Sequence, residues 1–137
     1  MFAEFEKITH EKEQNNEVLT SEELNSIYYD LNKKYFSNCI VDEEISLEWA
    51  RIPHFYTSFY VYKYATGISV ALSIVSDILS NKKDALDNYL LFLRSGGNDY
   101  PLNILKKCGI DIVNDDTIDK ALKVFDDTLD EFIKVRK

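Results

Sequence analysis

The chain has 137 residues, a formal net charge of −8 and an apolar content of 45%, which suits one domain with a single core. The negative charge argues against a nucleic-acid or anionic-membrane partner, since either would need a basic patch. Glycine and proline are scarce, which favours helices. No apolar run is long enough to span a bilayer, and we expect no signal peptide. With Cys39 and Cys108 far apart in sequence, we expect two reduced thiols in a cytoplasmic protein.

Residues 1–13 are predicted to form an amphipathic helix whose solvated face includes Glu6. The pattern begins without a cap, so we expect a fragment or a helix that lacks its partner. His10 and the glutamate after it resemble the first half of the zinc motif HExxH. That motif needs a second histidine four positions on, where this chain has Gln14. We therefore expect no metal site here and a solvated or hydrogen-bonded His10.

Two capped helices are predicted next. Thr20 and Glu23 form a capping box for a helix that ends near residue 36. Asp42 is placed to cap a short helix that ends near Ala50.

The segment 55–79 is predicted to be a long central helix. Its first half carries aromatic residues on every face, and a helix that is apolar all round is buried all round. On such a helix Tyr56 and Tyr60 would share one face. Gly67 lies in its interior, where glycine costs roughly 1 kcal/mol relative to alanine. We expect a close helix–helix approach at that position.

Three helices follow in the last third of the chain. Asp84 is placed to cap the first, and Pro101 suits the first turn of the second. A last amphipathic helix is capped within residues 115–117 and runs to Arg136. The fold class is therefore all-α, with about six or seven helices around the 55–79 helix, in a single domain over 1–137.

One cluster of side chains has chemical potential. His54 would lie at the start of the central helix, near free backbone N–H groups and the positive end of the helix dipole. With the tyrosines, it would form a set of hydrogen-bond donors, and such donors stabilise an oxyanion by about 2.7–4 kcal/mol each. The residues show neither a nucleophile nor a metal motif. An aromatic core with one hydrogen-bonded histidine is the simpler interpretation from composition alone.

Two neighbouring stretches have a distinctive order of aromatic residues, namely Arg51-Ile52-Pro53-His54-Phe55-Tyr56 and Phe59-Tyr60-Val61-Tyr62-Lys63-Tyr64-Ala65-Thr66-Gly67. Together they resemble the hallmark segment of oligoendopeptidase F, in the thimet-oligopeptidase family of zinc metallopeptidases. The similarity extends to the flanking stretches Met1–Glu6, Tyr89–Leu93 and Ser95–Gly97. It covers nearly the whole chain but only the C-terminal part of such an enzyme.

The resemblance implies a zinc-dependent hydrolase of oligopeptides. In that family zinc is held by the two histidines of HExxH and a further glutamate, which this chain lacks, so we expect no metal ligands here and zinc only in the full-length enzyme. The resemblance assigns transition-state stabilisation to His54 and Tyr60, and substrate binding to Tyr56 and Tyr62. It leaves open which of the three tyrosines contacts substrate.

The functional expectation is therefore a C-terminal metallopeptidase segment that supplies donor side chains and is inactive alone. Its partners would be an oligopeptide substrate and an upstream segment bearing HExxH. The alternative is a non-catalytic helical module, derived from the peptidase, that binds peptides or other proteins. Either would expose apolar surface, so we expect a two-fold homo-oligomer that buries part of Met1–Glu13 or Phe55–Tyr64. The residues and the resemblance leave open whether the chain itself is an enzyme.

Overall fold

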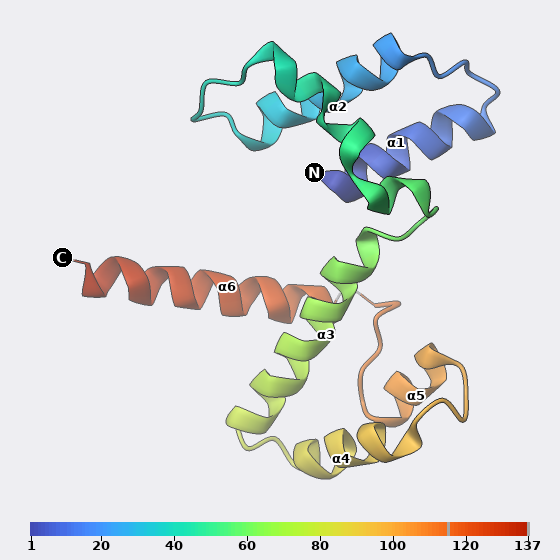
Figure 1. Ribbon diagram of the computed structural model, residues 1–137. Helices are drawn as coiled ribbons and strands as arrows, with labels where there is room; N and C mark the ends of the chain where they lie inside the picture. Colours follow the sequence, from blue (N-terminus) through green and yellow to red (C-terminus); the bar gives the residue numbers. More distant parts are fainter. Residues whose placement is uncertain (115, 137) are drawn as a thin grey trace. The chain divides into compact units, whose positions relative to one another are not determined.

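The structure is a computed structural model that describes residues 1–114 and 116–136, and this part of the chain is all-helical with no strands (Figure 1). The all-α prediction is confirmed, whereas Asp115 as a candidate cap lies outside the described residues. The α-helices are α1 (Phe2–Gln14), α2 (Ser21–Tyr35), α3 (Tyr62–Leu79), α4 (Ala85–Ser95), α5 (Pro101–Lys107) and α6 (Asp116–Val135), and the 3-10 helices η1 (Glu43–Arg51) and η2 (Pro53–Tyr56) lie between α2 and α3.

The chain divides into two compact units, Met1–Lys63 and Tyr64–Lys137. The single domain expected over residues 1–137 stays a prediction.

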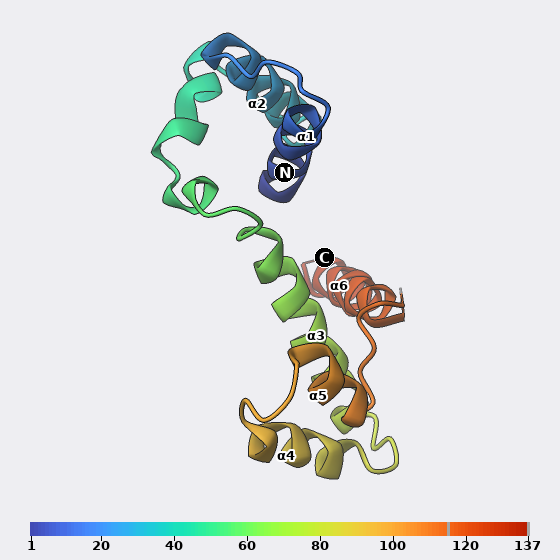
Figure 2. The same cartoon turned by 90° about the vertical axis from the view of Figure 1, so that its right-hand side faces the viewer.

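The first unit is built on α2. Both α1 and η1 pack against this helix (Figure 2). Thr20 caps it, because its Oγ1 accepts a hydrogen bond from the Glu23 N–H at 3.2 Å, as the sequence predicted. The core consists of Phe5, Tyr28, Leu31 and Ile52, with Met1, Ile8, Leu24, Ile27, Ile45, Trp49 and Phe55 packed around it.

Polar groups in this core are paired. The Tyr28 hydroxyl donates to Glu48 Oε2 at 2.8 Å, and Arg51 forms an ion pair with the same carboxylate. Burial, and then the Glu48 carboxylate, raise the pKa of Tyr28. Trp49 Nε1 donates to Asn25 Oδ1 at 2.8 Å. These bonds fix η1 on α2, and η1 leads directly to the segment that carries His54.

The aromatic run departs from the sequence prediction. The prediction of one continuous helix over 55–79 is wrong in its first part, because α3 begins only at Tyr62 and the residues between η2 and α3 form a turn. Phe59 in this turn has a φ of 55°, which no right-handed helix allows. The prediction that this segment is buried on every face is also wrong, since Tyr56 is 74% and Tyr64 is 59% exposed. The run is therefore only partly buried, with Phe55 packed against the core and Val61 buried while several of its tyrosines are exposed.

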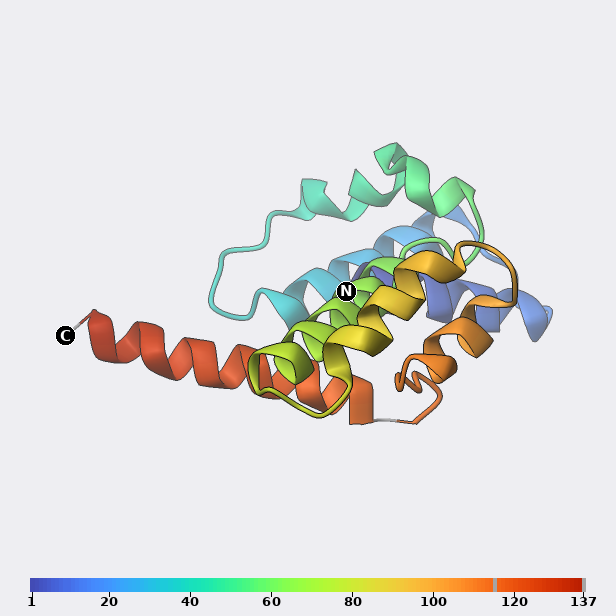
Figure 3. The same cartoon turned by 90° about the horizontal axis from the view of Figure 1, so that it is seen from below.

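In the second unit α4 and α5 form a helical hairpin (Figure 3). Pro101 occupies the first turn of α5, as predicted, and Gly109 follows the helix with a φ of 82°, which glycine tolerates. Ile104, Cys108 and Ile110 are buried around this corner, and Cys108 is a free thiol like the exposed Cys39. Burial raises the pKa of the Cys108 thiol.

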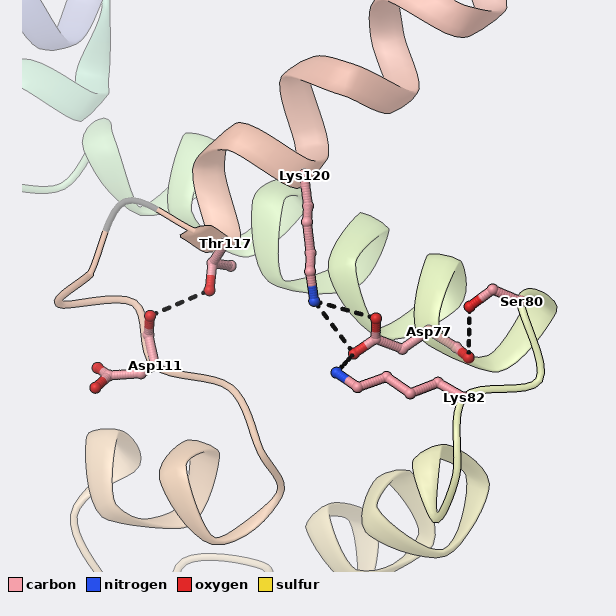
Figure 4. A network of polar contacts seen from close by, with 6 residues as sticks. All are labelled: Asp77, Ser80, Lys82, Asp111, Thr117 and Lys120. Atoms are coloured by element: carbon pink, nitrogen blue, oxygen red, sulfur yellow. Dashed lines mark hydrogen bonds and ion pairs between the residues drawn. The ribbon is translucent and has the colours of Figure 1, made fainter.

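An ion-pair network joins α3 to α6 (Figure 4). Asp77 accepts hydrogen bonds from Lys82 Nζ at 2.7 Å and from Lys120 Nζ at 3.1 Å. Burial alone would raise the pKa of Asp77, but the hydrogen bonds from Lys82 and Lys120 outweigh it and lower the pKa. Near the start of α6, the Thr117 hydroxyl donates to the Asp111 carbonyl at 3.2 Å.

Acid is expected to weaken this network. Because folding lowers the pKa of Asp77, the ionised carboxylate stabilises the folded unit above the ordinary value of 3.8, and this contribution is lost as pH falls through the folded pKa. Lys120→Met should cost about 1 kcal/mol at neutral pH and less at acid pH below 3.8, as Asp77 becomes protonated. Denaturant unfolding followed by circular dichroism measures both. Lys123→Met, which removes only the exposed pair with Asp127, is the matched control. An equal cost of Lys120→Met at both pH values would contradict this assignment.

Gly67 does not mark a close helix–helix approach, so that prediction is wrong. A methyl group built at Gly67 meets no atom within 4 Å. Because Gly67 is exposed in the helix interior, Gly67→Ala is expected to raise the free energy of unfolding by up to about 1 kcal/mol. Gly109→Ala, at a φ of 82°, should lower it. Chemical denaturation of both variants tests the contrast, and destabilisation by Gly67→Ala would reveal a packing contact there.

Candidate functional site

The candidate site lies in the first unit, on the segment that connects its core to α3. Ile52 is buried with an extended backbone, and Pro53 then begins the short 3-10 helix η2. His54 is therefore placed two residues after the buried Ile52, on a single turn of helix. The prediction that His54 begins the long helix is wrong, because η2 is separated from α3 by a turn.

The structure brings His54 and Tyr60 together. Their ring centroids are 5.3 Å apart with the planes inclined at 35°, and both side chains are half-buried. The Lys63 ammonium lies 5.1 Å from the centroid of the Tyr60 ring. The pair thus remains accessible to solvent, and an imidazole, a phenol and an ammonium group lie within one small region.

The other two predicted tyrosines have different environments. Tyr56 ends η2, and its hydroxyl donates to the Ala50 carbonyl at 2.7 Å, while the residue as a whole is 74% exposed. Tyr62 is 49% exposed at the first residue of α3. The prediction that Tyr56 and Tyr60 share a helical face is wrong, because the turn separates them.

Helix α1 supplies two supporting side chains that the sequence did not indicate. Glu6, expected on the solvated face, is only 5% exposed, and its Oε1 accepts a hydrogen bond from the Tyr60 N–H at 3.2 Å. The His10 ring stacks on Phe59 with centroids 4.3 Å apart. Both contacts reach residues about fifty positions away, so no local sequence pattern could have revealed them.

Metal binding finds no support in the residues present. Among residues 1–114 and 116–136, no group of three or more His, Cys, Asp or Glu side chains could hold a metal ion. The donor set at His54 and Tyr60 consists of one imidazole and a phenol, which does not fit a zinc site.

An open groove of about 1030 Å³ lies elsewhere in the first unit. It is lined by Met1, Phe2, Asn32, Phe36, Cys39, Ile40, Val41, Asp42, Glu44, Ile45, Leu47, Glu48 and Arg51. His54 and Tyr60 do not line it, so this groove is distinct from the candidate site.

None of the helices in the described part of the chain has the length and hydropathy that crossing a membrane requires.

Comparison with known proteins gives a consistent result. The family model described as Peptidase family M3 matches residues 1–124. Oligopeptidase PepF of Bacillus subtilis is 52% identical over 132 residues, covering 96% of this chain and 20% of that protein. An oligoendopeptidase F homolog of Borreliella burgdorferi is 48% identical, over 98% of this chain and 23% of that protein. The crystal structure of oligoendopeptidase-F from Enterococcus faecium superposes with a TM-score of 0.88 at 40% identity, over 97% of this chain and 26% of that one.

These matches confirm the resemblance predicted from the aromatic run. The chain spans about a fifth to a quarter of the length of the relatives it matches.

Proposed function

Because the chain belongs to the peptidase family M3, we propose that it is the C-terminal segment of a zinc metalloendopeptidase that acts on oligopeptides in the cytoplasm. Three features support this proposal: the family match, the names of the relatives, and the accessible donor pair on the η2–α3 segment. The resemblance implies that the HExxH motif of the family lies upstream of the segment similar to Met1–Glu6. When bound there, zinc would supply Lewis-acid chemistry that this chain's own residues do not provide.

The pairing of His54 with Tyr60 is the observation on which the proposal depends. A peptide carbonyl oxygen gains negative charge as its carbon is attacked, and donors held in place stabilise that charge. The His54 imidazole and the Tyr60 hydroxyl, with rings 5.3 Å apart, would donate to that oxygen. Each such donor contributes about 2.7–4 kcal/mol to transition-state stabilisation.

Tyr56 and Tyr62 would bind the substrate. Because the Tyr56 hydroxyl already donates to the Ala50 carbonyl, its exposed ring offers apolar contact surface rather than a proton. Tyr62 presents an exposed ring at the start of α3, adjacent in sequence to the donor turn.

The chain is expected to lack hydrolytic activity by itself. The decisive assay incubates it with Zn²⁺ and an internally quenched oligopeptide, alone and mixed with a polypeptide that carries the family's HExxH segment. We expect background hydrolysis alone and turnover on mixing. Turnover by the chain alone that disappears with His54→Ala would overturn the proposal that hydrolysis requires the HExxH segment.

A non-catalytic helical module that binds peptides or proteins is the second candidate. It is favoured by the exposed rings of Tyr56, Phe59 and Tyr62 in a chain whose described residues hold no metal cluster.

Either function leaves this surface available for self-association into a two-fold dimer. Light scattering at low concentration should detect the dimer, and a clean monomer would argue against it. Peptide binding without restored cleavage on mixing would favour the module.

A further inference from the structure

We propose that Glu6 and His10 of α1 are positioning residues that hold the 57–61 turn so that Tyr60 faces His54. This inference rests on the proposed function of the His54–Tyr60 pair. The contacts of the two α1 residues are with Tyr60 and Phe59, so their effect on the His54–Tyr60 pair would be transmitted through the turn.

The turn needs external support. Phe59 has a φ of 55°, in the left-handed region that a bulky side chain rarely adopts. Such a conformation persists only where surrounding contacts outweigh its strain, and strained residues of this kind cluster at binding and catalytic sites. Tyr60 follows Phe59 directly, so the direction of the Tyr60 side chain depends on this strained residue.

Glu6 supplies the first contact. Its side chain is 5% exposed, and a buried carboxylate requires hydrogen-bond donors to offset its lost hydration. One of these is the Tyr60 N–H, 3.2 Å from Glu6 Oε1. The bond joins residues 54 positions apart and therefore ties the backbone of the turn to α1.

His10 supplies the second contact, one helical turn later on the same face of α1. Its ring lies 4.3 Å from that of Phe59, with only 23° between the planes. Two consecutive residues of the turn are thus held by two side chains of a single helix. The α1 helix is in turn fixed to the core through Phe5, which is 3% exposed.

The first test measures the turn directly, without reference to activity. Hydrogen exchange of the Tyr60 amide in the full chain should accelerate by about tenfold or more in Glu6→Ala. Glu6→Gln should restore slow exchange, because its carbonyl oxygen still accepts the bond. Glu4→Ala is the matched control on the same helix, since Glu4 bonds to Lys34 and Tyr35 instead. Equal Tyr60 exchange in wild type and Glu6→Ala, or equal acceleration in Glu6→Gln, would overturn the proposal.

A parallel pair of variants tests the ring contact. His10→Phe keeps an aromatic ring over Phe59 and should leave Tyr60 exchange unchanged, whereas His10→Ala should accelerate it. Acceleration by both variants would refute a role for stacking.

The second test measures catalysis in a graft, in which this chain replaces the matched 132-residue stretch of Oligopeptidase PepF of Bacillus subtilis. Misplacing Tyr60 should lower kcat for an internally quenched nonapeptide by about 10²-fold in Glu6→Ala, with KM nearly unchanged. Glu6→Gln should recover most of the loss. A loss of equal size in both variants, or a change in KM alone, would contradict positioning. An inactive unsubstituted graft would instead count against the proposed function, while the exchange measurement still decides the role of Glu6.

Discussion

Phe5→Ala is expected to destabilise the first unit by about 3–5 kcal/mol, because a phenylalanine removed from a packed core leaves a cavity as well as losing its transfer energy. Phe5 is 3% exposed, and its ring lies 5.2 Å from Tyr28 and 5.0 Å from Phe55. A loss of this size approaches the whole stability of a small domain. Fluorescence of Trp49, whose ring is 6.3 Å from Phe5, reports the unfolding of this unit in denaturant.

Phe36→Ala provides the control for that experiment. Phe36 follows α2 and is 49% exposed, so its truncation should change the unfolding free energy by no more than about 1 kcal/mol. Similar losses from Phe5→Ala and Phe36→Ala would show that α1 is not packed as the structure has it. Such a result would also weaken the support that α1 gives to the candidate site.

His54→Ala is expected to lower kcat by about 10²–10³-fold in the graft on the Bacillus subtilis peptidase. The imidazole is one of the two donors that we propose for the developing oxyanion, and alanine offers no replacement. His54 follows a buried Ile52 and is itself only half-buried, so the substitution should leave the helical content unchanged. Steady-state kinetics with the quenched nonapeptide, together with circular dichroism, separates loss of function from loss of fold.

Tyr56→Phe is the matched variant on the same 3-10 helix. It removes a hydroxyl that donates to the Ala50 carbonyl and keeps the ring, so the expected effect on kcat is less than about tenfold. A large loss from Tyr56→Phe with a small one from His54→Ala would reverse the proposed roles of these side chains.

Local sequence patterns predicted several elements correctly but not every cap, because Asp42 and Asp84 precede their helices without a side-chain capping hydrogen bond. The Thr20 cap, the first helical turn at Pro101 and the apolar stripe of α6 each depend on residues within a few positions of one another. These signals gave the fold class and most helix boundaries correctly.

The aromatic run shows where periodicity fails. Its apolar composition satisfies a helical pattern, but Thr57 and Ser58 can bond to their own backbone and so compete with a helix. The contacts that hold the turn come from Glu6 and His10, far away in sequence. Burial was overestimated for the same reason, because composition does not say which rings lie against a neighbour.

The candidate site was predictable only in part. His54 stands out from its place after proline and within the family-like segment, and its pairing with Tyr60 follows from a turn rather than from the helical face expected. Glu6 could not have been identified, since on the helix pattern it belongs to the charged face and the hydrogen bond that it accepts comes from Tyr60, 54 positions away.

The most direct test is the rate at which the unsubstituted graft cleaves the quenched nonapeptide. We expect a kcat within about tenfold of the parent peptidase, because the chain would supply the same donors to the substrate. A graft that folds and binds the nonapeptide but hydrolyses it no faster than buffer would contradict the claim that this chain provides the substrate side of a peptidase.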